Sequence, residues 1–149
     1  MKLEEEIKQS KFRSEYQKLA VNIFYTHGWL VSKHSDLMKS FGITTSQYNI
    51  LRILRGQHPS TAPISLLKER MLDKMSDASR LVERLRTKGL LSRKICKEDR
   101  RRVNVLITTK GLSLLAKMDE YEKESESFLN KLSKSEAKEL NNLLDKLRG

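Results

Sequence analysis

The spacing of apolar side chains predicts a chain built mainly of helices. From Phe12 to Phe41, apolar positions recur every three or four residues, and Gly42 then supplies a stop. Because a helix rises 1.5 Å per residue, this helix would be roughly 40 Å or more long, which exceeds the width of a small domain. Part of its apolar face is therefore expected to meet a second subunit.

A group of shorter helices is predicted next. Thr44 and Gln47 have the spacing of a capping box before an apolar helix. Residues 56–63, GQHPSTAP, predict a loop, after which Ser65 can cap a third helix. A fourth helix is expected from Asp77 to Gly89, and two short helices joined by a tight turn indicate a helix-turn-helix.

The fourth predicted helix has a polar face that suits contact with bases and phosphates. That face mixes arginines with small polar groups, and its members are Asp77, Ser79, Arg80, Glu83, Arg84, Arg86 and Thr87. The alternative is that the arginines merely pair with Glu83 or Asp77 along the helix surface.

After Gly89 the apolar period changes from helical to two, which predicts a β-hairpin. Val103, Val105 and Ile107 share one face of the second strand, and the tip is basic. Arg102 points away from that face, whereas Arg101 falls in phase with it unless the tip turns it outward. A hairpin placed after a helix-turn-helix is a wing, although a basic tip can also serve only to discourage edge pairing.

The C-terminal part is predicted to be helical and amphipathic. Thr108 can cap one helix, and Ser133 and Glu136 form a capping box before another. Together with the first helix, these helices could bury a shared apolar face between two subunits. The predicted dimerisation residues are Phe12, Tyr16, Leu19, Leu140, Leu143, Leu144 and Leu147.

The net charge of the chain predicts a polyanionic binding partner. The 149 residues have a net charge of +11 and a pI of about 9.8. Residues 65–89 hold seven basic and four acidic side chains and residues 90–111 hold seven and two, so eight of the eleven net charges lie there. This asymmetry favours nucleic acid as the partner, with an anionic membrane surface as the alternative.

The sequence also limits location and chemistry. No apolar run approaches the roughly 20 residues that span a bilayer, and the first ten residues lack the apolar core of a signal peptide, so a cytoplasmic protein is expected. The single cysteine, Cys96, is either an inert small side chain or a redox sensor. No phosphate loop, zinc spacing or nucleophile elbow is present, so we expect no enzyme and no cofactor.

Two segments resemble the MarR family of bacterial winged-helix regulators. The stretch LRTKGLL of residues 85–91 leads into DRRRVNVLITTKG of residues 99–111, which is similar to the family's Gly-Leu, Asp-x-Arg and Leu-Thr-x-x-Gly pattern. Ile107 replaces the usual leucine. TTSQYNILRIL, residues 44–54, is similar to the family's Thr-x-x-Gln helix start.

The resemblance implies a mostly α fold with a small β-hairpin, in which a winged helix-turn-helix core is flanked by terminal dimerisation helices. We expect a single domain over 1–149, with dimerisation by 1–42 and 112–149 and DNA binding by 44–111. The function expected is that of a homodimeric repressor, which binds a pseudo-palindromic operator in double-stranded DNA and is released by a small aromatic or anionic effector. A protein- or RNA-interaction module without operator binding is the alternative.

The resemblance also implies roles for single residues. The fourth helix would enter the major groove, and Arg101 would enter the minor groove. From the residues themselves we expect Asp99 to hold Arg101 in position by an ion pair. The predicted DNA-binding set is Ser76, Asp77, Ser79, Arg80, Arg84, Arg86, Lys97, Asp99, Arg100, Arg101 and Arg102. The effector-pocket candidates are Tyr25, His27, Trp29 and His34. For the two histidines, packing in a core or interface is the simpler reading, since no third metal ligand lies nearby.

The sequence departs from the family pattern before the fourth helix. Leu72 stands where a glycine is common, Met75 where a lysine or polar residue is common, and Asp77 where threonine or serine is frequent. Asp77 could cap the helix or accept a hydrogen bond from a cytosine, but it would repel a phosphate. The base preference at this position is therefore not inherited from the family.

Overall fold

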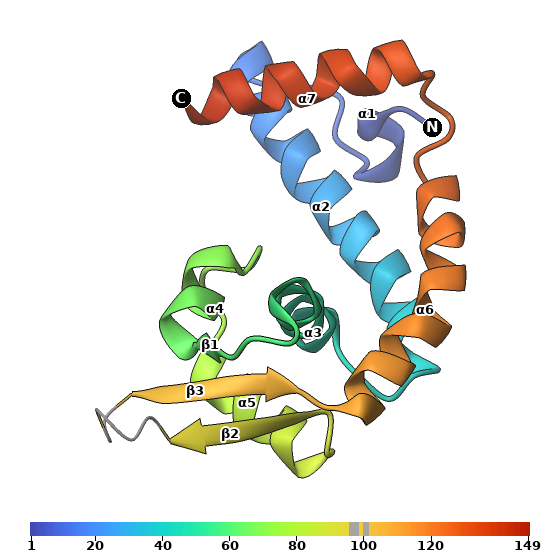
Figure 1. Ribbon diagram of the computed structural model, residues 1–149. Coiled ribbons are helices and arrows are strands. Elements are labelled where there is room, and N and C mark those ends of the chain that lie inside the picture. The colour runs from blue at the N-terminus through green and yellow to red at the C-terminus, as the bar shows by residue number, and fades with distance from the viewer. Residues whose placement is uncertain (96–98, 100–101) are drawn as a thin grey trace. The chain divides into compact units, whose positions relative to one another are not determined.

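The computed structural model describes residues 1–95, 99 and 102–149 (Figure 1). The chain divides into two compact units, Met1–Thr45 and Ser46–Gly149. The first unit contains the short helix α1 (Leu3–Glu6) and the long helix α2 (Glu15–Lys39). None of the helices formed by the described residues is long and apolar enough to cross a membrane.

The long helix confirms the helical period of the sequence but begins later than predicted. The Ser14 hydroxyl accepts a hydrogen bond from the Gln17 amide at 3.2 Å and so fixes the helix start at Glu15. Phe12 therefore precedes the helix. The 25 residues of α2 correspond to a length of about 37 Å.

The helix α1 was not predicted, and two polar contacts hold it against α2. The Tyr25 hydroxyl donates to Glu6 Oε2 at 2.8 Å, and Lys18 Nζ pairs with Glu4 Oε1 at 2.5 Å. Four residues are too few to leave a helical period in the sequence.

The remaining elements follow the winged helix-turn-helix order. They are α3 (Thr45–Gln57), β1 (Ala62–Pro63), α4 (Ile64–Arg70), α5 (Ala78–Thr87), β2 (Leu91–Ile95), β3 (Val103–Ile107), α6 (Thr109–Ser127) and α7 (Lys134–Arg148). The predicted fourth helix, the hairpin and both C-terminal helices are confirmed. The chain is mostly helical with a small sheet, as expected.

Two local predictions around the third helix were wrong. Ser65 does not cap α4, because the helix already begins at Ile64 and Pro63 occupies the N-cap position. The expected loop GQHPSTAP contains strand β1, which pairs with β3 through Ala62 and Val105. The sheet consequently has three antiparallel strands in the order β1-β3-β2, rather than the hairpin alone.

The second unit is organised around an apolar core to which helices and strands both contribute. Helix α4 contacts β1 and β3, and α5 contacts α4 and β2. The largest fully buried side chains are Ile50, Leu51, Leu54, Leu67, Val82, Leu85, Leu91, Val105, Leu115 and Met118. Because α5 buries Ala78, Val82 and Leu85, its opposite face is directed to solvent.

The end of α5 is fastened to the start of α6. The Thr108 hydroxyl donates to the Gly89 carbonyl at 2.7 Å and accepts from the Gly111 amide at 3.1 Å. Lys110 Nζ donates to the Lys88 carbonyl at 2.9 Å. These bonds close the base of the hairpin, so the position of the hairpin relative to α5 is fixed where the two meet.

Candidate nucleic-acid interface

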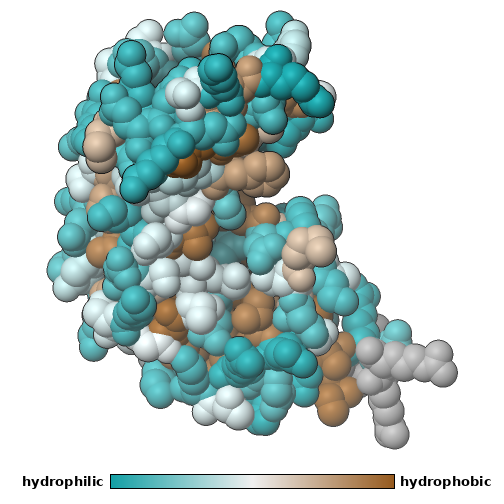
Figure 2. Space-filling view, turned by 180° about the vertical axis from the view of Figure 1, so that it is seen from behind, coloured by the Kyte–Doolittle hydropathy of each residue, from teal (hydrophilic) through white to brown (hydrophobic). Residues whose placement is uncertain are grey.

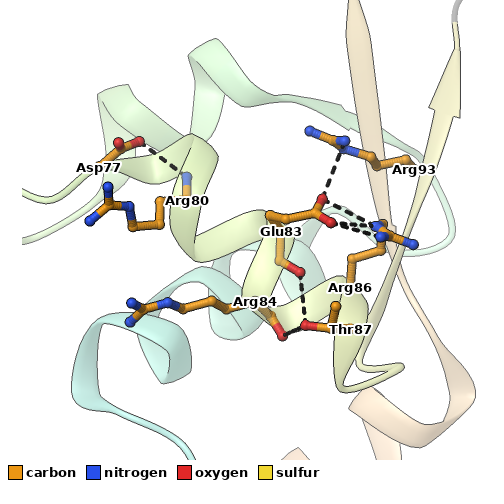
Figure 3. A network of polar contacts seen from close by, with 7 residues as sticks. All are labelled: Asp77, Arg80, Glu83, Arg84, Arg86, Thr87 and Arg93. Atoms are coloured by element: carbon orange, nitrogen blue, oxygen red, sulfur yellow. Dashed lines mark hydrogen bonds and ion pairs between the residues drawn. The ribbon is translucent and has the colours of Figure 1, made fainter.

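The exposed face of α5 presents two guanidinium groups, those of Arg80 and Arg84, to solvent. Ser79, Arg80 and Arg84 are all exposed. Among the described residues, neither Arg80 nor Arg84 has an ion-pair partner, and both side chains are directed away from Glu83 (Figure 3). These two positive charges are therefore free to meet an anionic ligand.

The start of α5 is capped by an acid. Asp77 Oδ1 accepts a hydrogen bond from the Arg80 amide at 3.1 Å, and the backbone of Asp77 is extended. This is the capping role considered for Asp77 from the sequence. The carboxylate occupies the place where a phosphate could otherwise bind the first amides of the helix.

The third arginine of α5 is engaged within the protein. Arg86 Nη2 donates to Glu83 Oε1 at 2.7 Å and Arg86 Nε donates to Oε2 at 3.1 Å, so the pair has two parallel contacts. Arg93 Nη1, on β2, lies 3.3 Å from Glu83 Oε2. The hydrogen bonds from Arg86 lower the pKa of Glu83, and Glu83 in turn raises the pKa of Arg86. Arg86 thus follows the pairing alternative of the sequence analysis.

The turn before α5 is held by polar contacts, and two of its apolar side chains are exposed to solvent. Asp73 accepts hydrogen bonds from the Met75 amide at 3.0 Å and from the Ser76 hydroxyl. Asn49 Oδ1 of α3 accepts from the Leu72 amide at 2.9 Å. Leu72 is 87% exposed and Met75 is 93% exposed. Ser76 is half-buried, so it is less accessible to a ligand than Ser79.

The described part of the hairpin adds further positive charge. Arg93, Lys94 and Arg102 are exposed, and the Arg102 amide donates to the Asp99 carbonyl at 2.9 Å. Lys97, Arg100 and Arg101, as well as Cys96, lie outside the described residues, and their predicted roles stay predictions. Arg93 was not among the predicted DNA-binding residues. It follows buried Leu91 by two positions and lies opposite buried Val105, so the strand period gave no signal that Arg93 pairs with Glu83.

A polar cluster joins α3, the first helix of this unit, to α6. The Tyr48 hydroxyl donates to Glu122 Oε1 at 2.7 Å, Arg52 pairs with the same oxygen at 2.7 Å, and Arg55 pairs with Asp119 at 2.8 Å. Burial, reinforced by the bond to Glu122, raises the pKa of Tyr48 to about 12. The winged helix-turn-helix is therefore tied to the helix that leads towards the C-terminus.

The effector-pocket candidates all lie on α2. Tyr25, His27 and Trp29 are exposed, His34 is half-buried, and the Tyr25 hydroxyl is already engaged by Glu6. Within residues 1–95, 99 and 102–149, no three His, Cys, Asp or Glu side chains are grouped in a way that could hold a metal ion.

The predicted dimerisation residues are largely solvent-exposed. On α2, Tyr16 is 85% exposed and Leu19 45%; on α7, Leu143 is 56% exposed and Leu147 57%. Leu140 is also exposed, whereas Phe12 and Leu144 are half-buried. Each of these two helices therefore presents apolar side chains to solvent.

Known proteins with the same fold are regulators of transcription. Residues 43–103 match the model of the MarR family. A MarR transcription factor from Planctomyces limnophilus is 29% identical, with a TM-score of 0.70 over 91% of this chain and 98% of that one. A comparison with curated proteins gives no match.

Two further solved structures connect the fold with DNA. A MarR variant from E. coli in complex with operator DNA is 22% identical, with a TM-score of 0.79 over 93% of this chain and 99% of that one. BpsR of Bordetella bronchiseptica, whose DNA binding is regulated by 6-hydroxynicotinic acid, is 20% identical, with a TM-score of 0.68 over 86% of this chain and 99% of that one. Members of the MarR family are transcription regulators, not enzymes. With residues 43–103 matching the MarR family model and a three-stranded winged helix-turn-helix fold, the chain resembles the transcription regulators of the MarR family.

Proposed function

We propose that this protein is a homodimeric repressor that binds a pseudo-palindromic operator in the bacterial cytoplasm. Each subunit places α5 in a major groove, and the two half-sites lie about one helical turn of DNA apart. The basic side chains of the wing contact phosphates and the minor groove. The observation that carries the proposal is that Arg80 and Arg84 are exposed on α5 and have no ion-pair partner in the part of the chain that the structure describes.

The arrangement on α5 favours reading of bases over general attraction to charge. Arg80 and Arg84 are four positions apart and therefore lie on one side of the helix, with Ser79 beside them. Arginine is suited to guanine edges in the major groove, and a small hydroxyl side chain permits close approach. The Asp77 carboxylate disfavours a phosphate at the start of α5. The helix is therefore expected to contact DNA through the side that carries Arg80 and Arg84 rather than through its N-terminal end.

A binding experiment tests the proposal against the RNA-binding alternative. Fluorescence anisotropy would compare the protein's own promoter region, a random duplex and an RNA of equal length, each over a series of salt concentrations. We expect the promoter duplex to bind at least about a thousandfold more tightly than the random duplex, the lower end for specific regulators. Preference for the RNA would refute the proposal.

Single substitutions connect that affinity with α5. Arg80→Ala and Arg84→Ala should each weaken promoter binding by about 1–3 kcal/mol, the range for a base contact, and relax the sequence preference at one position of the site. Lys117→Ala removes the same charge from an exposed position on α6 and serves as the control. Equal losses in the control and the α5 variants would contradict the placement of α5.

The dimer is supported by apolar side chains that are about half exposed in the single chain. Hydrophobic residues reach the surface between hydrophilic ones at several places (Figure 2). Helix α7 buries none of its residues, and its leucines at 140, 143 and 147 are separated by three and four positions along one helical face. Exposed apolar stripes of this kind mark interfaces between proteins, and a second copy supplies the same stripe by symmetry.

The dimer is tested by placing a charge in this stripe. Leu143→Glu should give a monomer in sedimentation velocity and abolish tight promoter binding, since a half-site alone supplies only part of the contacts. Asn142→Glu introduces the same charge at the neighbouring exposed position and should leave the dimer intact. A dimer of unchanged stability in Leu143→Glu would exclude α7 from the interface.

An effector that releases DNA is the remaining part of the proposal. Its support is BpsR, which has the same fold and responds to an aromatic acid. The aromatic and imidazole side chains on α2 provide the matching chemistry in this chain. A screen of small aromatic acids should find compounds that raise the Tm and lower promoter affinity. A compound that raises the Tm equally in Trp29→Ala would place the pocket elsewhere.

A further inference from the structure

We propose that Glu83 determines the specificity of DNA binding by keeping Arg86 and Arg93 away from phosphates, so that Arg80 and Arg84 are the cations that α5 offers to DNA. The inference rests on the proposed placement of α5 in the major groove. It concerns a residue that neither touches a base nor carries the charge that attracts DNA.

The geometry places one carboxylate between two arginines from different elements. Glu83 and Arg86 are one turn apart on α5, whereas Arg93 comes from β2 (Figure 3). Arg86 uses both Nε and Nη2 on the carboxylate, and Arg93 lies against Oε2 at 3.3 Å. Both carboxylate oxygens are therefore engaged, and the two guanidinium groups are held against Glu83.

The same three side chains remain open to solvent, which is why the pairing matters for DNA. Glu83 is 44% exposed, Arg86 45% and Arg93 41%. An arginine with this exposure beside a DNA-reading helix would bind phosphate if it were free, because a phosphate accepts the same paired hydrogen bonds as a carboxylate. In this protein the Glu83 carboxylate takes the place of a phosphate as the partner of Arg86 and Arg93.

The consequence follows from how phosphate contacts act. Each phosphate that a protein neutralises adds affinity for any DNA sequence, and it adds about 0.9 to the magnitude of the slope of log K against log salt concentration. Two additional contacts would thus strengthen binding to random DNA as much as to an operator. By restricting the number of free arginines, Glu83 limits this sequence-independent affinity.

The variant Glu83→Gln tests this directly, because glutamine keeps the size of the side chain and removes its charge. With a random duplex, the salt slope of Glu83→Gln should be steeper than that of the wild type by about 1–2 per subunit. Its ratio of promoter to random-duplex affinity should fall. Glu139→Gln on α7 changes the net charge by the same amount at an exposed position and should leave the slope unchanged.

Two further variants assign any change to the named arginines. The triple variant Glu83→Gln, Arg86→Gln, Arg93→Gln should return the slope to the wild-type value. Arg86→Gln with Arg93→Gln, keeping Glu83, should also have the wild-type slope, because neither arginine contacts phosphate in the wild type. This last variant keeps the inference refutable even if Glu83→Gln does not fold, because a shallower slope would show that Arg86 or Arg93 already contacts phosphate in the wild type.

Several results would overturn the inference. These are an unchanged slope in Glu83→Gln, a steeper slope that persists in the triple variant, or a shallower slope in the double arginine variant. Weaker binding of Glu83→Gln at every salt concentration without a steeper slope would assign Glu83 a structural role only. If the wild type did not prefer its promoter, the proposed function would be refuted. The salt slopes measured with the random duplex would still test whether Glu83 keeps Arg86 and Arg93 away from phosphates.

Discussion

Gly111 is the position at which a single methyl group is expected to disturb the junction between the wing and α6. A Cβ atom at Gly111 would lie 2.3 Å from the Leu90 carbonyl oxygen and 2.7 Å from Ile107 Cγ1. Neither neighbour can move away freely. The Leu90 carbonyl accepts a hydrogen bond from the Thr108 amide at 3.1 Å, and Ile107 is only 3% exposed.

The size of the effect follows from two opposing contributions. Forcing an extra carbon into a packed region costs about 1–3 kcal/mol, and the backbone oxygen in the way points to the upper end. Alanine gains about 1 kcal/mol over glycine within a helix. We therefore expect Gly111→Ala to lower the free energy of unfolding by about 2 kcal/mol, and to lower the Tm by about 4–8 °C for a chain of this size.

Urea and thermal unfolding followed by circular dichroism would measure this change. Gly56→Ala provides a matched control within α3, because a Cβ atom there meets nothing within 4 Å. The control should be neutral or more stable by up to about 1 kcal/mol. If Gly111→Ala were as stable as Gly56→Ala, the close approach of Gly111 to Leu90 would not exist, and the described junction would be wrong.

Three further substitutions test other parts of the structure. Asp77→Ala should cost about 1 kcal/mol through loss of the α5 N-cap, measured by urea unfolding, and yet strengthen binding to random DNA by removing a negative charge. Tyr48→Phe should cost about 1–2 kcal/mol through loss of the bond to Glu122, measured in the same way. Because the pKa of Tyr48 is raised to about 12, its neutral form stabilises the fold fully below its ordinary value near 10, and this stability is lost as the pH rises through 12. The wild type should therefore lose more stability than Tyr48→Phe between pH 9 and pH 11. Ser133→Ala should remove one half of the α7 capping box and reduce helix content by far-UV circular dichroism, while Ser135→Ala within the helix should not.

The elements that were predictable from sequence are those determined by neighbouring residues. The capping box of Ser133 and Glu136, the cap of Asp77 and the strand period around Val105 are local signals, and each appears where it was expected. Strand β1 has no such signal. It consists of two residues that become a strand only because Val105, more than forty positions away, pairs with Ala62.

The arginines of α5 at the candidate interface were predictable from the sequence, but which arginines form ion pairs was only partly predictable. The spacing of Glu83 and Arg86 on one helix already indicated an ion pair. The participation of Arg93 depends on how β2 returns beside α5, and this is set by the bonds of Thr108 and by the core rather than by any local pattern. The sequence therefore identified the arginines without separating the free ones from those that are engaged.

Helix α7 has a consequence for how assembly could be observed. It buries none of its residues within the chain, and its 15 residues are close to the length at which an isolated helix is marginal in water. Its local capping signals select the helix, but lasting stability requires contact with another surface. If that surface belongs to a second copy, the helix content of the protein becomes a function of its concentration. Serial dilution followed by far-UV circular dichroism would then show the last helix melting as the copies separate, before the winged core unfolds.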